Sequence, residues 1–101
     1  MDTKWLEDFV SLAETRSFSR SAQLRHVTQS AFSRRIQSLE AWAGVELVDR
    51  SAYPTRLTAA GATFYLQAQE ILQSLQSSRA QLRSPEAAHM ELRVANPDLG
   101  Q

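Results

Sequence analysis

Four polar residues in the first half of the chain share one face of a predicted helix: Gln29, Ser30, Ser33 and Arg34. Each side chain carries a hydrogen-bond donor, and none is a carboxylate. Glutamine can pair with N6 and N7 of adenine, and arginine with O6 and N7 of guanine. A helix that enters the major groove of DNA needs donors of this kind near its N-terminus. These residues therefore predict recognition of base edges.

Further residues around this face are suited to contact phosphates, which position a protein on DNA without reading its sequence. We expect these to be Ser19, Arg20, Thr28, Arg35, Gln37, Arg50 and Arg56. Alternatives stay open for three arginines. Arg25 and Arg35 also fit a solvated surface, and Arg50 also fits an ion pair with Glu46 or Asp49.

The net charge of the chain is zero, but the charge is unevenly distributed. Residues 15–39 contain five arginines and no acidic residue, whereas residues 1–14 carry a net charge of −3 and residues 40–101 a net charge of −2. A polyanion responds to local charge rather than to the total. The basic segment therefore favours nucleic acid as a partner, although the same composition also fits a solvated helical face.

Other classes of function find little support in the composition. The chain has no cysteine, so neither a disulfide nor a thiolate metal site can form. His26 and His89 are remote in sequence, and there is no glycine-rich phosphate loop. We therefore expect no enzyme, no metal and no cofactor. The sequence also lacks a basic signal at its start and an apolar run that could span a membrane, which predicts a cytoplasmic protein.

The spacing of apolar residues predicts the helices that present these side chains. We expect a helix over residues 4–14, a short helix over 18–25 and a third over 29–42, with hydroxyls of residues 17–19 and Thr28 as N-caps and Gly44 at the end of the third. The short helix is expected to turn Phe18, Ala22 and Leu24 inward. The apolar face of the third helix is expected to consist of Phe32, Ile36, Leu39 and Ala43.

The rest of the sequence predicts a hairpin, a long helix and the start of a second domain. Residues 45–57 have strand formers on both sides of a turn, and Thr58 can cap a helix that Ser84-Pro85 stops. That helix is roughly 37 Å long. Residues 84–101 are expected to be a hinge and the first strand of a second domain, cut short here.

The long helix also carries an apolar seam with the alternating spacing of four and three that coiled coils show. The predicted dimerisation residues are Phe64, Ala68, Ile71, Leu72, Leu75 and Leu82. A body of 57 residues is too small to cover the whole stripe, so we expect a second copy of the chain to cover it. The alternative is that the helix folds back on its own domain.

Taken in order, these motifs resemble the N-terminal domain of LysR-type transcriptional regulators. The match runs from about residue 5 to residue 82 and includes Phe18-Ser19-Arg20-Ser21-Ala22, Thr28-Gln29-Ser30-Ala31-Phe32-Ser33-Arg34-Arg35-Ile36, Leu39-Glu40, Gly44-Val45-Glu46-Leu47-Val48-Asp49-Arg50 and Leu57-Thr58-Ala59-Ala60-Gly61. The opening Trp5-Leu6 and the run 31–36 are also similar to a subgroup that includes hypochlorite-responsive regulators.

The resemblance implies a mostly α fold, with a winged helix-turn-helix of three helices and a two-stranded wing over residues 1–57 and a dimerisation helix over 58–83. It also implies an antiparallel dimer that binds an interrupted inverted repeat in double-stranded DNA and regulates transcription. An effector, either a small molecule or an oxidant, would bind a second domain that this chain lacks. In the family, residues that match Gln29, Ser30, Ser33 and Arg34 meet DNA, and the position of Arg50 serves the wing.

Three positions depart from the family pattern. Ser30 stands where the family usually has proline, Val48 where it has phenylalanine and Ser21 where it has alanine. The first change affects a residue expected to contact DNA, and the other two affect packing. A protein-interaction module is the remaining alternative to DNA binding. It would place an apolar residue on the outer face of the third helix, where the sequence has serine, arginine and glutamine.

Overall fold

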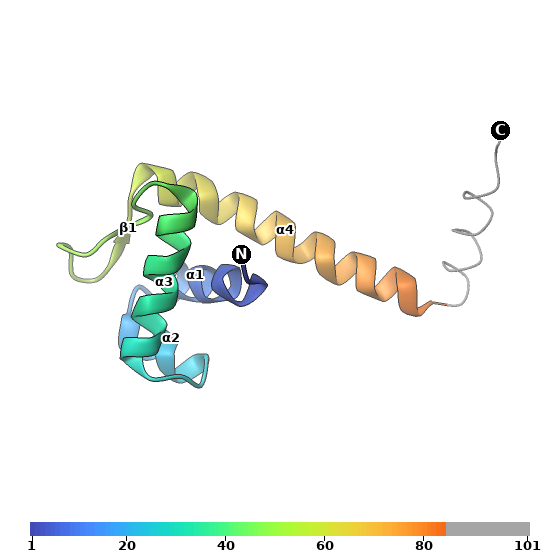
Figure 1. Cartoon of the computed structure of the whole chain (residues 1–101), viewed down its shortest axis with the longest axis horizontal. Helices are drawn as coiled ribbons and strands as arrows, with labels where there is room; N and C mark the ends of the chain where they lie inside the picture. The colour runs from blue at the N-terminus through green and yellow to red at the C-terminus, as the bar shows by residue number, and fades with distance from the viewer. Residues whose placement is uncertain (85–101) are drawn as a thin grey trace.

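The computed structural model describes residues 1–84 as a small helical body from which one long helix projects (Figure 1). The elements in chain order are α1 (Thr3–Thr15), α2 (Phe18–Leu24), α3 (Gln29–Ala43), β1 (Val48–Asp49), β2 (Arg56–Leu57) and α4 (Ala59–Arg83). The predicted mostly α architecture of three helices, a two-stranded wing and a long helix is therefore confirmed. The hinge and strand expected in the last part of the chain lie outside the described residues.

Hydroxyl groups begin three of the helices, as the sequence predicts. The side chain of Ser17 accepts from the backbone N–H of Arg20 at 3.1 Å, and that of Thr28 accepts from Ala31 at 3.1 Å. Thr58 caps α4 in the same way. At the other end of α3, Gly44 adopts a left-handed φ of 76°, which glycine adopts without a steric penalty. These local signals explain where the elements begin and end.

The core lies where α1, α2 and α3 meet, and it includes Phe9, Leu12, Phe32, Ile36 and Leu39. The prediction for Leu24 is wrong, because this side chain is 53% exposed at the end of α2. Ser21 is buried instead. It is suited to that place because its hydroxyl bonds to Ser11 at 3.0 Å and to Thr15 at 2.7 Å.

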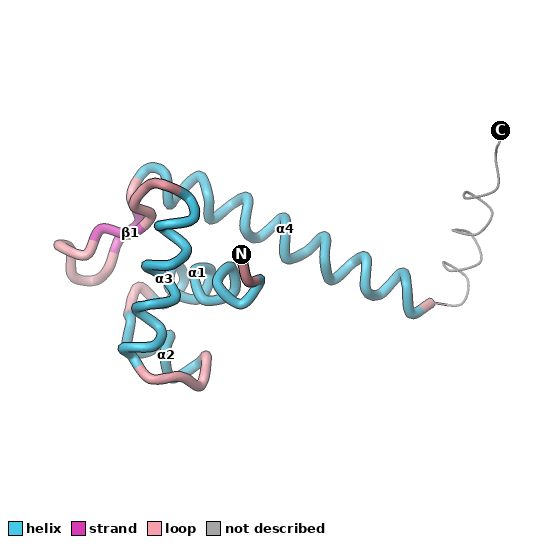
Figure 2. Tube along the Cα trace, in the orientation of Figure 1, coloured by secondary structure: helices cyan, strands magenta, loops and turns pink. Residues whose placement is uncertain are grey.

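The wing is shorter than the sequence predicts. Its strands are antiparallel and two residues long, with Val48 opposite Leu57 and Asp49 opposite Arg56. The N–H groups of Leu47 and Val48 donate to a carboxylate oxygen of Glu40. A side chain of α3 therefore satisfies backbone groups at the base of the wing, and Figure 2 shows the loop beyond β1 projecting from the body.

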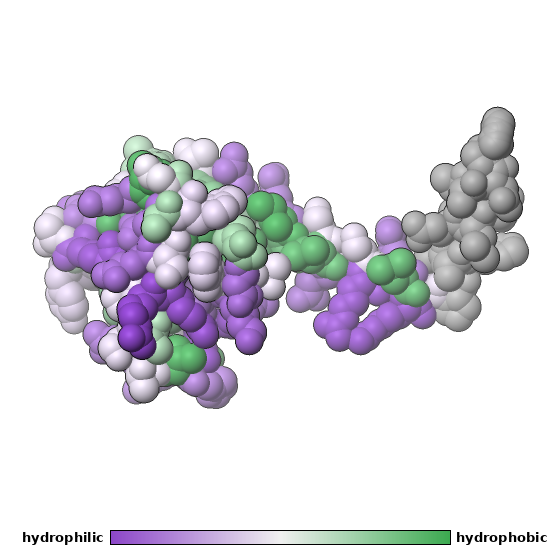
Figure 3. Space-filling view, in the orientation of Figure 1, coloured by the Kyte–Doolittle hydropathy of each residue, from purple (hydrophilic) through white to green (hydrophobic). Residues whose placement is uncertain are grey.

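The first half of α4 packs on its own domain. Phe64 lies against Phe9 with ring centroids 5.5 Å apart, and Ala68 is fully buried. Ala68 is therefore covered by its own domain, which leaves no surface of this predicted dimerisation residue for a second chain, and Phe64 is partly covered. Farther along, Ile71, Leu75 and Leu82 stay exposed. Figure 3 shows apolar side chains along α4 beyond the body.

Within residues 1–84, no helix is long and apolar enough to cross a membrane.

Candidate nucleic-acid interface

A tight turn joins α2 and α3 into a helix-turn-helix. His26 adopts a left-handed φ of 60°, and the N–H of Val27 donates back to the carbonyl of Ala22 at 3.0 Å. The turn ends at Thr28, which caps α3. The first residues of α3 therefore stand at a surface end of the body, with their backbone N–H groups directed outward along the helix axis.

The polar face of α3 is open to solvent. Gln29, Ser30, Arg34 and Gln37 are exposed, and Ser33 is half-buried. Within residues 1–84, the guanidinium of Arg34 has no ion pair. The structure therefore leaves the donors of the five residues accessible to an external partner.

Beside this face, a groove of about 360 Å³ separates the start of α3 from the wing. Its lining includes Gln29 and Ser33 on one side and the segment 50–53 on the other, with Phe18 and Thr55 completing it. At the tip of the wing, Tyr53 is 97% exposed. The N-terminal half of α3 and the wing thus stand side by side.

Arg50 forms an ion pair with a residue of α3. Its partner is Glu40, and not Glu46 or Asp49, the two alternatives that the sequence leaves open. Its Nη1 lies 2.9 Å from Oε1 of Glu40, and its guanidinium lies over the ring of Phe18 at 5.7 Å from the centroid. The other carboxylate oxygen of Glu40 accepts from the base of the wing at 2.8 and 3.1 Å. Glu40, a residue of α3, therefore connects α3 to the base of the wing, and its ion pair with Arg50 strengthens this connection.

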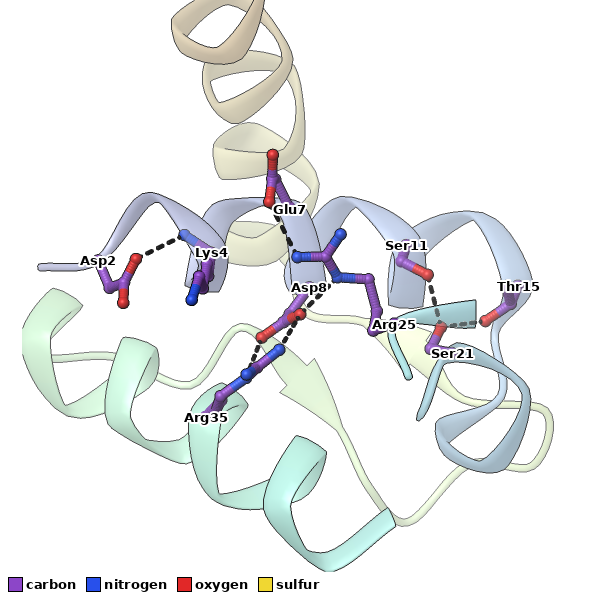
Figure 4. Close-up of polar contacts among 9 residues, drawn as sticks. All are labelled: Asp2, Lys4, Glu7, Asp8, Ser11, Thr15, Ser21, Arg25 and Arg35. Atoms are coloured by element: carbon purple, nitrogen blue, oxygen red, sulfur yellow. Dashed lines mark hydrogen bonds and ion pairs between the residues drawn. The ribbon is translucent and has the colours of Figure 1, made fainter. Parts of the chain in front are cut away.

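Arg35 is expected from the sequence to flank the DNA-facing surface, but the structure turns it inward to Asp8 (Figure 4). Its Nε and Nη2 donate to the two oxygens of Asp8 at 2.6 and 2.8 Å. Arg25 donates from Nε to the same carboxylate at 2.8 Å and from Nη2 to Glu7 at 2.9 Å. The carboxylate of Asp8 is fully buried, so Arg35 has a structural role that a phosphate contact would disturb.

These contacts stabilise the charged form of both arginines. Burial lowers the pKa of Arg25, but the hydrogen bonds to Asp8 and Glu7 outweigh it and leave the pKa above its ordinary value. The hydrogen bonds to Asp8 likewise raise the pKa of Arg35. The solvated alternative for the two arginines is therefore wrong, since α1, α2 and α3 meet at one ion cluster.

Asp8 and Glu40 position this surface, although neither is among the functional residues predicted from the sequence. Asp8 lies three residues after Trp5 and four before Leu12, on the inward side of α1, and an acidic residue there needs a buried cation. The position of Asp8 in the sequence could therefore have predicted a buried ion pair. Glu40 stands out in the sequence as the first acid after the basic segment and as part of the motif Leu39-Glu40, but its spacing does not point to the wing.

The remaining predicted phosphate contacts lie on the surface. Ser19 and Arg20 are exposed in the first turn of α2, and Arg56 is exposed on β2. Ser19 hydrogen-bonds to the capping hydroxyl of Ser17 at 3.2 Å. The hydroxyl of Thr28 accepts the capping hydrogen bond of α3 and also lies 3.4 Å from the hydroxyl of Ser30.

Sequence comparisons identify relatives of this chain. The family model described as bacterial regulatory helix-turn-helix protein, lysR family, matches residues 3–62. The HTH-type transcriptional regulator YjiE of Escherichia coli K12 is 43% identical over 96 residues, covering 94% of this chain and 32% of that protein. The chain thus spans about a third of the length of this curated relative.

Solved structures share the fold. DarR of Vibrio fischeri, solved in complex with DNA, is 45% identical with a TM-score of 0.80, over 81% of this chain and 28% of that one. HypT of Salmonella, described as a hypochlorite-specific LysR-type regulator, is 45% identical with a TM-score of 0.79, over 83% and 29%. BenM_DBD in complex with catB site 1 DNA is 29% identical with a TM-score of 0.83, over 88% and 96%.

Proposed function

The chain belongs to the LysR family of bacterial helix-turn-helix regulators, and from this premise we propose that it binds double-stranded DNA sequence-specifically as a homodimer and regulates transcription. The observation that carries the proposal is the exposed donor face of α3, which stands beside the wing groove. Gln29, Ser30, Ser33 and Arg34 contact bases in the major groove. The similarity to DarR and BenM_DBD, both solved in complexes with DNA, supports this assignment.

Phosphate contacts come from residues around that face. Ser19, Arg20 and Thr28 lie at the starts of α2 and α3, Gln37 lies farther along α3, and Arg56 lies on the wing. Arg50 lines the groove while it holds Glu40, so it supports the wing more than it binds phosphate. A protein-docking function is disfavoured because the exposed face of α3 at its N-terminal half carries no large apolar side chain.

The dimer is proposed on the second half of α4. Ile71, Leu75 and Leu82 are 43%, 48% and 66% exposed, and Leu72 lies beside them. Side chains of this type at seam spacing are covered when two such helices pair. Two chains related by a twofold axis then bind two half-sites, which gives an interrupted inverted repeat.

The test of this function is selection of bound duplexes from a random-sequence library at roughly physiological salt, followed by sequencing. We expect enrichment of an interrupted inverted repeat, whose spacing reports the geometry of the dimer. Binding without enrichment would reduce the function to nonspecific association. Absence of binding would contradict the proposal and favour a protein partner.

The first substitution concerns base recognition. Arg34→Ala is expected to weaken binding to the selected site by about 1–3 kcal/mol and to relax the preference at one position of each half-site. The reason is that its guanidinium is free of intramolecular ion pairs within residues 1–84 and accessible to a guanine. Repeating the selection with the variant measures the effect. An unchanged preference would remove Arg34 from the base-contacting set.

The second substitution concerns the dimer. Leu75→Glu is expected to shift the chain toward monomer in sedimentation equilibrium, because it places a charge in the apolar seam. Leu66→Glu is the matched control. Leu66 is 64% exposed and lies nine residues before Leu75, which places it on the opposite side of the helix. If both variants dimerise alike, the seam is not the interface.

Control by an effector would involve residues other than those of the DNA-binding domain. The curated relative is about three times as long as this chain, and HypT is described as hypochlorite-specific. We therefore propose that a small molecule or an oxidant acts on an additional domain of the whole protein. The relatives are named as transcriptional regulators, which supports a role without catalysis and a cytoplasmic location.

A further inference from the structure

The wing has a second face, turned away from α3, that none of the predicted base contacts uses. A cleft of about 260 Å³ lies there, between the end of α1, β2 and the start of α4. Arg16 and Arg56 line it together with Thr55 and four apolar residues, Leu12, Ala13, Leu57 and Ala62. Thr55 also lines the groove on the α3 side, so the returning segment of the wing separates the two spaces.

The two arginines bring positive charge to this cleft. Within residues 1–84, neither Arg16 nor Arg56 has an ion pair. The acidic residue across the wing is Asp49, opposite Arg56. Asp49 is engaged by the hydroxyl and N–H of Ser51, which lower its pKa, and the charge of Arg56 adds to that effect. In contrast, Arg25 and Arg35 are neutralised by Asp8 and Glu7.

Arg16 occupies a backbone position that glycine adopts more easily than arginine. It ends α1 with a left-handed φ of 58°, where glycine is favoured. Its carbonyl accepts from the N–H of Thr55 at 3.1 Å, which joins the end of α1 to the wing. Glycine could supply both the cap and this bond, because both use only the backbone. Beyond the favourable position of its charge at the C-terminal end of α1, the arginine side chain therefore contributes what it presents to the cleft.

We propose that Arg16, which lines this cleft beside the wing residue Arg56, binds a phosphodiester group of the DNA that flanks each half-site. This inference rests on the proposed function. When α3 enters the major groove, the wing follows the adjacent backbone, and its far face turns outward along the duplex. Cations on that face then meet phosphates beyond the base-contacting segment, in the way that sequence-independent contacts position a protein. Arg16 thereby extends the bound segment past the half-site.

The test compares two duplexes that carry the same selected inverted repeat. One ends at the outer edge of the half-sites, and the other is longer by roughly half a helical turn at each end. The unaltered chain is expected to bind the longer duplex about tenfold more tightly. Arg16→Gly is expected to bind both alike, with a log–log salt slope on the longer duplex that is smaller by about 0.9 for each phosphate that the variant no longer neutralises.

Two controls separate this result from a general loss of charge or fold. Arg83→Ala removes one positive charge from the far end of α4 and is expected to keep the preference for the longer duplex. Arg16→Gly is expected to keep or raise Tm, because glycine adopts the left-handed conformation freely. If the unaltered chain binds the two duplexes equally, or if Arg16→Gly keeps the preference, the inference is wrong. If no duplex is bound, the proposed function itself fails.

Discussion

Gly61→Ala is expected to destabilise the domain by about 3 kcal/mol, a large part of the roughly 5–15 kcal/mol that typically holds a domain together. A Cβ at this position would lie 1.9 Å from the carbonyl oxygen of Leu47 and 2.9 Å from its carbonyl carbon. Both are backbone atoms at the base of the wing, so no side-chain rotation relieves the clash. The helical preference of alanine over glycine favours the variant by only about 1 kcal/mol.

The physical consequence is that α4 must move away from the wing. Phe64, one turn farther along, would then separate from Phe9. Urea unfolding followed by circular dichroism measures the free energy. Gly44→Ala is the matched control, because Gly44 has a positive φ but a Cβ added there would meet no atom within 4 Å. It should show only backbone strain of about 1–2 kcal/mol. Equal effects in the two variants would contradict close packing at Gly61.

Asp8→Ala is expected to cost about 3 kcal/mol of folding stability, since removing one partner of a buried ion pair leaves uncompensated charge. Asp8 is fully buried and receives three charge-assisted hydrogen bonds, from Arg25 and Arg35. The two guanidinium groups remain about one quarter exposed, so water offsets part of the loss. The value therefore falls at the low end of the range for buried pairs.

Glu7→Ala is the matched control for this prediction. Glu7 pairs with the same Arg25 at 2.9 Å, but its side chain is 45% exposed. Its removal is expected to cost no more than about 0.5 kcal/mol. A double-mutant cycle of Asp8→Ala with Arg35→Ala should show strong coupling, because the residues contact each other directly. If Asp8→Ala behaves like Glu7→Ala, the cluster does not hold the three helices together.

The Asp8 variant also bears on DNA binding. The cluster joins α1 to the end of α2 and to the middle of α3, and thus sets the angle at which α3 is presented. We expect Asp8→Ala to lower the ratio of specific to nonspecific affinity even at temperatures where it stays folded. Arg35 would no longer be restrained beside Arg34, so nonspecific affinity should fall less than specific affinity.

Features that depend on neighbours along the chain could be predicted from the amino-acid sequence alone. Helix periodicity located α1, α3 and α4, and the hydroxyls of Ser17, Thr28 and Thr58 marked three helix starts, because an N-cap satisfies N–H groups only two or three residues away. The exposed donor face of α3 followed from the same periodicity.

Which charged and apolar side chains were left for a partner depended instead on tertiary packing. Arg35 is paired with a residue 27 positions away, and no local spacing distinguishes it from Arg34, its exposed neighbour. Ala68 continues the same seam as Leu75, but the body covers one and not the other. Burial and ion pairing depend on how distant segments pack, and a pattern within one helix specifies which face is apolar or charged without specifying what covers it.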